Sequence, residues 1–469
     1  MRFKPVNDST PSCFTTSSLQ SPLSRSNNRR PFSFAPVARI ASITLMLLFG
    51  WCWLAQYLPG WSGRLVCAAE PEPIRVAPTD WPWWRGPHGN GVAASDQQAP
   101  TTWNATKNIV WKANVPGRGH SSPTVMGDQV IVTTAEEDKE IQAVISYDRA
   151  TGKQRWRTDV HRGGFDKKGN KKTSQASGSA AFDGSRIIVN FLNQGAIYTT
   201  ALDPAGKQIW QTRVSDFATH QGFGSSPTLF GPYAYIATDS RASGVVAALD
   251  RATGKIAWSQ SRPDKPSYAS VSILNVAGKQ QAIIQGCDLV TSYDPLTGNK
   301  FWEIEGSTTE CVTSVVTDGE LIFVSGGYPR NHTQAVKADG SGKTVWENGT
   351  RVYVPSMLVS KGFLYASLDA GVAMCWKSST GEEMWKSRLG GTFSASLVQV
   401  GDLLYATNES GTIFLFKANP QEFQLVGQNQ LGDEVYATPS ICGGRIYHRV
   451  AEIKGDQRQE VLYCIGEAK

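Results

Sequence analysis

The sequence lacks the short motifs that carry several well-known catalytic and metal chemistries. It contains no HExxH and no GxSxG stretch, so the motifs for zinc-assisted hydrolysis and for an activated serine are missing. No CxxC pair occurs either, and a zinc site built on cysteines therefore has no support. None of the histidines shows the spacing of metal ligands. The six histidines are His88, His120, His161, His220, His332 and His448.

The main part of the chain also lacks an excess of basic residues. The formal net charge is +6, but residues 1–68 hold seven Lys and Arg and a single acid, Asp8. The remaining chain has 39 basic and 39 acidic residues, and its net charge is zero. Because nucleic-acid-binding domains normally carry a basic surface, this balance argues against a nucleic-acid partner.

Helix-type apolar periodicity is scarce, and the one long apolar run lies near the N-terminus. Residues 40–58 carry no charge, follow several basic residues and precede the small residues around Ala68. This is the order of an export signal, although 19 apolar residues could also cross a bilayer if left uncut. We expect residues 1–68 to be either a signal peptide or a retained anchor. The rest should be exported to the periplasm or cell envelope, with membrane contact only through this segment.

Five cysteines lie beyond the leader. Export permits disulfides, and an odd number leaves at least one thiol free or paired between molecules. The simplest interpretation is that these thiols are buried as small apolar side chains in strands, and the sequence leaves their pairing open. They are Cys287, Cys311, Cys375, Cys442 and Cys464.

One string recurs along the chain: an Asp, a turn of the Thr-Gly-Lys type, and a Trp. It is complete in ALDRATGKIAW (248–258) and partial at 146–156, 201–210 and 292–302. The closing Trp recurs at intervals of 45, 54, 48, 44, 44 and 39 residues, beginning at Trp111. A tight-turn signal between two apolar runs occurs eight times. Units of about 45 residues that are rich in β-branched and aromatic residues are typical of propeller blades.

We therefore predict an all-β fold, an eight-bladed β-propeller of four-stranded antiparallel blades over residues 108–469. Residues 69–107 form a lead-in segment. The last unit lacks a fourth strand, and residues 108–115 carry a Trp without a blade of their own. This N-terminal strand should complete the C-terminal blade and so remove the open sheet edges. The outer strand of the seventh unit, 424–430, has no Trp.

The recurring residues have structural explanations. The glycine tolerates a positive φ in the turn, and the aspartate accepts hydrogen bonds from turn amides. The tryptophan covers the gap to the next blade and offers its N–H to the neighbouring backbone. The predicted docking residues are Trp111, Asp148, Gly152, Trp156, Trp210, Asp250, Gly254, Trp258, Asp294, Gly298, Trp302, Trp346 and Trp385.

The string A-x-D-x-x-T-G-K-x-x-W resembles the tryptophan-docking motif of pyrroloquinoline-quinone (PQQ) propellers, and residues 248–258 match every specified position. The resemblance covers roughly residues 108–469. It implies the eight-bladed PQQ-like repeat family, which includes quinoprotein alcohol dehydrogenases and the non-catalytic BamB-type assembly propellers. The stretch WPWWRGPHGNG (81–91) also resembles the lead-in of PQQ-like repeat proteins.

For an enzyme of this family the resemblance implies vicinal cysteines over the quinone, a calcium ion held by Glu, Asn and Asp, and a catalytic Asp. The chain has no adjacent cysteines and no acid-rich loop that suggests a calcium cage. We predict no catalytic residue and no metal site, and the cofactor-binding residues stay unknown. The leading hypothesis is an exported, monomeric, non-catalytic scaffold with an envelope protein partner. The alternatives are a dehydrogenase that uses PQQ with calcium on alcohols or sugars, and a carbohydrate-binding propeller.

In a propeller, the loops that join successive blades share one face with the loops between second and third strands. Residues 116–120, 161–175, 215–224 and 326–332 should lie on that face, with basic residues between aromatic ones. The hypothesis is that this face binds a partner protein or an anionic envelope ligand. The candidate binding-face residues are Arg118, His120, Lys167, Lys168, Lys171, Lys172, His220, Tyr328, Arg330 and His332.

Overall fold

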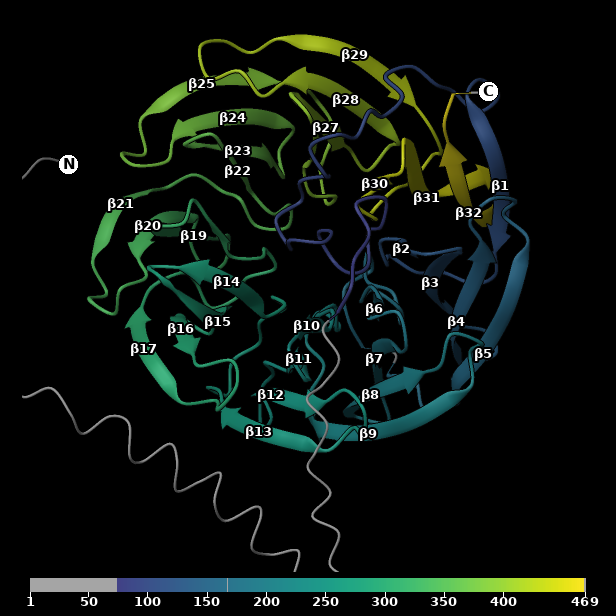
Figure 1. Cartoon of the computed structure of the whole chain (residues 1–469), viewed down its shortest axis with the longest axis horizontal. Coiled ribbons are helices and arrows are strands. Elements are labelled where there is room, and N and C mark those ends of the chain that lie inside the picture. The colour runs from purple at the N-terminus through teal and green to yellow at the C-terminus, as the bar shows by residue number, and fades with distance from the viewer. Residues whose placement is uncertain (1–73, 167, 468–469) are drawn as a thin grey trace, which may run out of the picture. The chain divides into compact units, whose positions relative to one another are not determined.

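The structure is a computed structural model that describes residues 74–166 and 168–467. In these residues, 32 strands form eight four-stranded antiparallel sheets arranged around one axis (Figure 1). The predicted all-β, eight-bladed propeller is confirmed. The predicted signal or anchor at residues 1–68 and the candidate Lys167 lie outside the described residues. In the described part of the chain, no helix has the length and apolar character needed to cross a membrane.

The first four blades follow one another along the chain, and each runs from an inner strand at the axis to an outer strand at the rim. Their strands are β2 (Thr124–Met126), β3 (Gln129–Glu136), β4 (Ile141–Asp148), β5 (Gln154–Arg162); β6 (Ala181–Phe182), β7 (Ile187–Asn193), β8 (Ala196–Leu202), β9 (Gln208–Asp216); β10 (Thr228–Phe230), β11 (Tyr233–Ala237), β12 (Val245–Asp250), β13 (Ile256–Ser261); and β14 (Ser272–Val276), β15 (Lys279–Gly286), β16 (Leu289–Tyr293), β17 (Lys300–Glu305).

Blades 5 to 8 continue the same order, and blade 8 takes its outer strand from the start of the propeller. Their strands are β18 (Val316–Thr317), β19 (Leu321–Gly326), β20 (His332–Lys337), β21 (Thr344–Asn348); β22 (Leu358–Ser360), β23 (Phe363–Leu368), β24 (Val372–Lys377), β25 (Glu383–Arg388); β26 (Val398–Val400), β27 (Leu403–Thr407), β28 (Thr412–Lys417), β29 (Leu425–Gln430); and β30 (Ser440–Cys442), β31 (Arg445–Lys454), β32 (Gln457–Ile465), β1 (Ile109–Val115).

The ring closes through β1, as predicted. This strand pairs antiparallel with β32, so that Trp111 lies opposite Cys464 and Val115 opposite Glu460. The two ends of the propeller chain are therefore held in one sheet, and blade 8 has no missing strand.

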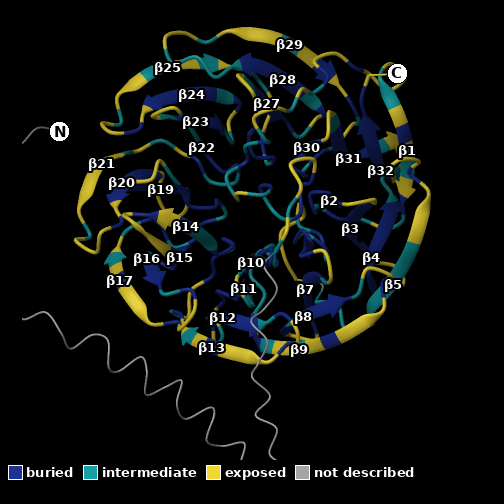
Figure 2. Ribbon diagram, in the orientation of Figure 1, coloured by how far each residue is buried: buried dark blue, intermediate teal, exposed yellow. Residues whose placement is uncertain are grey.

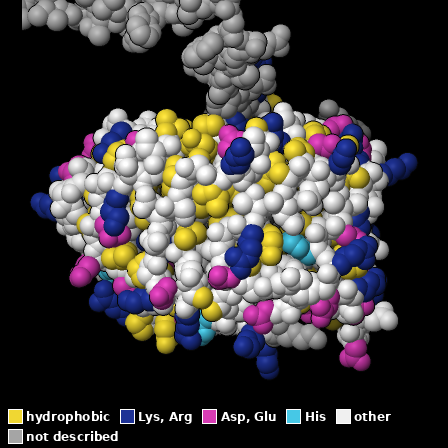
Figure 3. All heavy atoms as spheres, turned by 90° about the horizontal axis from the view of Figure 1, so that it is seen from below, with side chains coloured by type: hydrophobic (Ala, Val, Ile, Leu, Met, Phe, Trp, Pro, Cys, Tyr) yellow, Lys and Arg dark blue, Asp and Glu magenta, His cyan; other side chains and the backbone are white. Residues whose placement is uncertain are grey.

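The second and third strands of each blade are buried on both faces, because a neighbouring blade covers each face. In β3 all eight residues are buried, polar and apolar alike. The outer strands are largely exposed (Figure 2). In β13 only Trp258 is buried. Seen from the side of β13, acidic and basic side chains are interspersed over the rim (Figure 3).

The recurring string forms the docking contact between blades. Asp250 Oδ1 accepts hydrogen bonds from the Thr253 amide (2.8 Å) and from the Thr253 hydroxyl (2.7 Å). Gly254 has a φ of +73°, and a Cβ on it would lie 2.6 Å from the ring of Trp210 in the preceding blade. The Trp210 indole N–H donates to the carbonyl oxygen of Arg251 at 3.0 Å. The turn of one blade therefore packs against the tryptophan of the blade before it, and we call this turn the seat of that tryptophan.

Six tryptophans make this same N–H to carbonyl bond to the next blade, at 2.7 to 3.1 Å: Trp111, Trp156, Trp210, Trp258, Trp346 and Trp385. Trp302 differs, since its N–H donates to the Gln281 side chain at 2.9 Å. Gln281 in turn donates to the carbonyl oxygen of Ala338 in the next blade at 2.9 Å. One side chain therefore bridges this contact, where the turn of blade 5 has a different sequence.

The seam between blades 7 and 8 has no tryptophan on β29, and the lead-in fills it with Trp103. This side chain is 3% exposed and lies parallel to Tyr405, with ring centroids 6.4 Å apart. Asn429 of β29 accepts from the Trp103 amide at 2.9 Å and donates to the carbonyl oxygen of Thr101 at 3.0 Å. The lead-in therefore supplies the large aromatic residue that the seventh repeat lacks.

The lead-in then closes one end of the central channel. Trp81 exchanges two backbone hydrogen bonds with Val125 of blade 1, and Ala93 donates to the carbonyl oxygen of Gln399 of blade 7 at 2.9 Å. Arg85 is buried between these contacts and donates to the carbonyl oxygen of Met357 in blade 6 at 2.7 Å. Burial lowers the pKa of Arg85 to about 9. Figure 1 shows this segment crossing the centre of the ring.

Candidate functional site

A cavity of about 640 Å³ lies on the propeller axis, and we call it the cup. Its floor is Trp84 of the lead-in, whose indole N–H donates to the Ser314 hydroxyl at 2.9 Å. Trp84 also lines a second cavity, of about 560 Å³, between the lead-in and blades 3 and 4. The cup is therefore open at one end of the channel and blocked by an aromatic ring at the other.

A ring of hydroxyl groups, one from each blade, surrounds the axis just above the floor. The backbone amide of a ring residue donates a hydrogen bond to the hydroxyl of the ring residue in the next blade. This bond is present between six of the eight pairs of neighbouring blades, at 2.9 to 3.0 Å. At Ser314 the Trp84 indole takes the place of one missing donor, and in the described chain the Ser122 hydroxyl has no partner. The ring consists of Ser122, Ser179, Ser226, Ser270, Ser314, Ser356, Ser396 and Thr438.

One wall of the cup is built around a buried carboxylate from the connection between blades 4 and 5. Glu310 is 3% exposed and accepts a hydrogen bond from the Tyr353 hydroxyl at 2.9 Å. The other Glu310 oxygen lies 3.2 Å from His220 Nε2. The Arg351 guanidinium lies 4.8 Å from the centre of the Tyr353 ring. Burial and the neighbouring Glu310 carboxylate raise the pKa of Tyr353, which is therefore a neutral hydrogen-bond donor at physiological pH.

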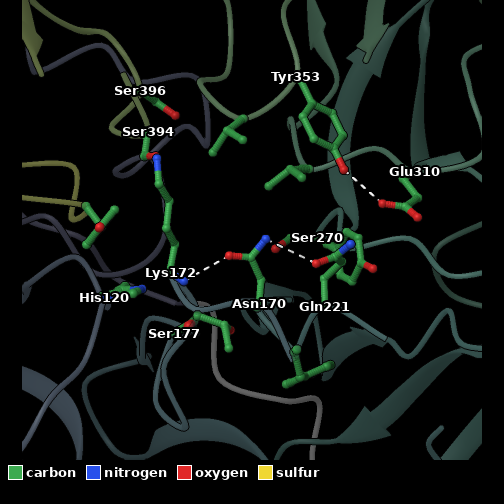
Figure 4. Close-up of a pocket in the computed structure, with 18 of the residues that line it drawn as sticks. His120, Asn170, Lys172, Ser177, Gln221, Ser270, Glu310, Tyr353, Ser394 and Ser396 are labelled. Carbon is green, nitrogen blue, oxygen red and sulfur yellow. Dashed lines mark hydrogen bonds between the residues drawn. The ribbon is translucent and has the colours of Figure 1, made fainter. Parts of the chain in front are cut away.

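The facing wall is neutral. His120 packs against Tyr436 with ring centroids 4.4 Å apart. Burial, together with the guanidinium groups of Arg118, Arg449 and Arg458, lowers the pKa of His120 well below its ordinary value. Figure 4 shows His120 on the side of the cup opposite Tyr353 and Glu310. His120 is therefore an uncharged imidazole at physiological pH.

The segment that contains Lys172 crosses the open end. Its Nζ lies 2.7 Å from a carboxylate oxygen of Glu409, which belongs to the loop between β27 and β28 of blade 7. On its other side, the Asn170 side chain donates to Gln221 Oε1 at 3.2 Å (Figure 4). Sequence reasoning placed Lys172 on this face but missed its partner, because the loop with Glu409 carries no signal of its own.

All four loops that the sequence placed on one face contribute to the cup, and we call them together the mouth (residues 116–120, 161–175, 215–224 and 326–332). The candidates that line the cup are His120, Lys172, His220 and Tyr328. Lys171 and Arg330 are exposed on the mouth loops, as is Lys168, which lines a small neighbouring pocket. Arg118 is half-buried and donates weakly to the carbonyl oxygen of Lys171 at 3.4 Å.

His332 is not among the residues that line the cup. This residue begins strand β20, is 6% exposed, and pairs through Nε2 with Glu347 of the outer strand at 3.2 Å. The turn before it brings His332 into the ladder opposite Gly326 of β19, at the end of the mouth loop.

The sequence did contain a signal for the hydroxyl ring. A Ser or Thr precedes the first strand of every unit, and successive members are 57, 47, 44, 44, 42, 40 and 42 residues apart. Two of the copies share the string S-S-P-T, at 121–124 and 225–228. The same search that found the tryptophans could have found these residues.

Sequence and structure comparisons agree with the propeller fold. A family model described as outer membrane protein assembly factor BamB matches residues 86–216, 142–387 and 329–422. The chain belongs to this family of PQQ-like repeat propellers.

One relative is named as an enzyme. A polyvinylalcohol dehydrogenase of Sphingopyxis sp. (strain 113P3) is 26% identical over 405 residues, which is 82% of this chain and 52% of that protein. The chain thus spans about half the length of this curated relative.

Solved structures show the same fold at low identity. A europium-containing methanol dehydrogenase has a TM-score of 0.59 at 11% identity, covering 83% of this chain and 98% of that one. BamB from Moraxella catarrhalis has a TM-score of 0.53 at 14% identity, covering 76% and 96%. A quinohemoprotein alcohol dehydrogenase from Comamonas testosteroni has a TM-score of 0.55 at 15% identity, covering 83% and 81%.

The cup residues do not fit the quinone and calcium of the family's dehydrogenases. A calcium site needs several oxygen ligands, usually with more than one carboxylate, and Glu310 is the single acid among the described residues that line the cup. The described chain contains no group of three or more His, Cys, Asp and Glu placed to hold a metal ion. The quinone is a tricarboxylate. Of the lysine and arginine side chains that line the described cup, Lys172 is engaged by Glu409 and Arg351 donates to the carbonyl oxygen of Gly327.

The five cysteines beyond the leader are all buried and unpaired in the structure. Burial raises the pKa of Cys375 and Cys442 to about 12 and that of Cys464 to about 11. They are therefore protonated thiols at neutral pH and pack as small apolar side chains.

Proposed function

We propose that the chain is a non-catalytic binding propeller that works as an interaction scaffold in the cell envelope. Its mouth is the surface that receives an envelope protein partner. The observation that carries the proposal is Tyr328, which is 56% exposed at the edge of the cup. Arg330 follows two residues later and is also exposed. Aromatic and Arg side chains are the residues that most often dominate binding between proteins.

The contacts between the mouth loops support this proposal, because a surface that is already ordered loses less entropy on binding. The Asn170 amide donates to the carbonyl oxygen of Gln221 at 2.9 Å. The Glu310 amide donates to the carbonyl oxygen of Tyr328 at 3.2 Å, which holds that loop against the wall with the buried carboxylate. Backbone hydrogen bonds between loops therefore hold the loops of Asn170 and Tyr328 in place.

The test is site-specific photocrosslinking of the full chain in its native envelope. A photoreactive amino acid at Tyr328 should yield a discrete crosslinked protein, whereas the same probe at Phe301 on the rim, which is 36% exposed, should not. The double substitution Tyr328→Ala and Arg330→Ser should lower recovery of that partner by about tenfold, a loss of ~1.4 kcal/mol. The same crosslinked products at Tyr328 and Phe301 would contradict the proposal.

The proposal includes export, with the folded part in the periplasm or another envelope space. Mass spectrometry of the protein from fractionated cells should show either an N-terminus close to Ala69 or an intact leader in the membrane fraction. Recovery of the full-length chain from the cytoplasm would overturn this part.

A second candidate function is oxidation of an alcohol or sugar with PQQ, and the identity to the polyvinylalcohol dehydrogenase favours it. The single acid of the described cup lining and the engaged Lys172 ammonium speak against it. The purified protein would be incubated with the quinone and Ca²⁺ and assayed for reduction of an artificial dye with alcohols and aldoses. Quinone absorbance that persists through gel filtration, together with dye reduction, would establish the dehydrogenase and displace the scaffold proposal.

A further inference from the structure

The cup is a second binding site that lies below the exposed mouth residues of the proposed function and shares Tyr328 with them at its edge. Its volume of about 640 Å³ is within the roughly 300–1,000 Å³ of typical small-ligand sites. It is blind, because Trp84 and the hydroxyl ring close its inner end. A ligand that fills it must therefore enter through the mouth, with one end leading.

Each charged side chain that lines the cup is paired with a polar group. Lys172 faces Glu409 at 2.7 Å, and Glu310 is engaged by both His220 and Tyr353. The Arg351 guanidinium donates to the carbonyl oxygen of Gly327 at 2.7 Å. An ionic ligand would have to separate one of these pairs or leave its own charge unmatched, and either costs free energy in a partly desolvated cavity. The cup therefore favours a neutral ligand.

The rest of the lining alternates aromatic faces with neutral hydrogen-bonding groups. Trp84 forms the floor, while Phe223 and Tyr436 lie along the walls. Between them stand the hydroxyls of the ring and the amide side chains of Asn170 and Gln221 (Figure 4). A pyranose ring has the complementary chemistry, since its C–H face packs on aromatic rings and its edge carries hydroxyls that both donate and accept.

We infer that the cup binds a neutral saccharide and that it receives the terminal residue of the glycan. The blind floor selects a chain end, the matched charges select against amino and acidic sugars, and the aromatic floor stacks on the ring of the terminal residue. The binding requires no quinone and no metal ion, and it includes no chemical step.

The experiment is a glycan array followed by calorimetry on the full exported chain. The array would contain neutral oligosaccharides and their amino-sugar and uronic-acid counterparts with the same linkage. The neutral member of a matched set should bind at least about tenfold more tightly than either charged member, which corresponds to ~1.4 kcal/mol. Binding to no neutral glycan, or tighter binding of a charged member, would overturn the inference.

End recognition is tested with matched linear and cyclic forms of whichever neutral glycan binds. The linear form should bind, and the cyclic form, which has no terminal residue, should not. Equal affinity for both would overturn the assignment of the cup, because a blind cavity cannot admit a closed ring in the same way.

Trp84 and Trp83 are neighbours in the sequence and provide a test variant and its control. Trp84→Ala removes the floor and should weaken glycan binding by about tenfold, whereas Trp83→Ala changes only the cavity behind the floor and should leave binding unchanged. Trp84→Phe keeps an aromatic floor and should restore most of the affinity. Loss with Trp83→Ala equal to that with Trp84→Ala would overturn the inference. Partner crosslinking at Tyr328 reports the proposed function separately, so failure of one does not imply failure of the other.

Discussion

The rim and the cup are made from the same eight repeats, but the contacts of the rim recur from blade to blade and most side chains of the cup do not. On the rim, six tryptophans donate to a carbonyl of the next blade in the same way. In five of these contacts a glycine of the accepting turn lies against the tryptophan ring. In the cup only the hydroxyl ring repeats, and above it each connection between blades carries different side chains. Glu310, His120 and Lys172 have no counterparts in the other blades. The comparison teaches that repeated contacts hold the ring together and that unrepeated connections create the site.

The largest expected effect is the loss of a rim tryptophan. Trp258→Ala should lower the free energy of unfolding by about 3–5 kcal/mol, because it leaves a cavity between blades 3 and 4 and removes the bond to Pro295. Urea unfolding followed by circular dichroism measures it. Trp156→Ala is the matched variant at a partly exposed position, and its loss should be smaller. A Trp258→Ala protein as stable as the wild type would refute the role of the rim.

The seat of the tryptophan should be nearly as sensitive. Gly254→Ala should cost about 2–4 kcal/mol, since the residue has a φ of +73° and the added Cβ would meet the Trp210 ring at 2.6 Å. Gly278→Ala is the control, with a φ of +76° and no atom within 4 Å, and should cost about 1 kcal/mol. Thermal or urea unfolding compares them, and equal losses would show that the contact with Trp210 does not matter.

A buried histidine of blade 8 should make stability depend on pH. Burial lowers the pKa of His448 to about 3, and in the described chain neither ring nitrogen has a hydrogen-bond partner. The unfolded state binds the proton more tightly, so stability is lost as pH falls from about 6.5 toward 3.

Between pH 7.5 and pH 5 the wild type should lose about 2 kcal/mol more than His448→Leu, as measured by urea unfolding at both values. His88 is exposed, and His88→Leu serves as the control that should follow the wild type. Parallel losses in the wild type and His448→Leu would exclude this histidine as the cause.

The smallest effect on stability is expected at the open end of the cup. Lys172→Met removes an ion pair in which the Lys side chain is 55% exposed, and the loss should be below about 1 kcal/mol. Lys300→Met, which removes an exposed pair with Glu303 on the rim, should behave alike in urea unfolding. The two variants should differ in glycan binding, because only Lys172→Met alters the cup. A stability loss at Lys172 comparable to that at Trp258 would erase the distinction between rim and cup.

Much of the fold was predictable, because each blade repeats a local signal. The turn of residues 250–254 and its tryptophan appear in sequence as one string, and the eight tight-turn signals between apolar runs give the number of blades. The role of Trp103 was not predictable, because it replaces the missing tryptophan of β29 from more than 300 residues away along the chain. The burial of His332 at the start of β20 was not predictable, because sequence spacing does not show on which side of a strand end a residue falls.

By itself, the sequence determined the eightfold repeat, its closure by residues 108–115, the neutral charge balance beyond the leader, and the loops that share one face. Tertiary structure alone decided that Trp84 blocks the channel, that Glu409 neutralises Lys172, and that Glu310 is buried between His220 and Tyr353. The physical reason is the range of the interactions. A blade is encoded by neighbours within about 45 residues, whereas the cup exists only where eight blades and the lead-in meet on one axis.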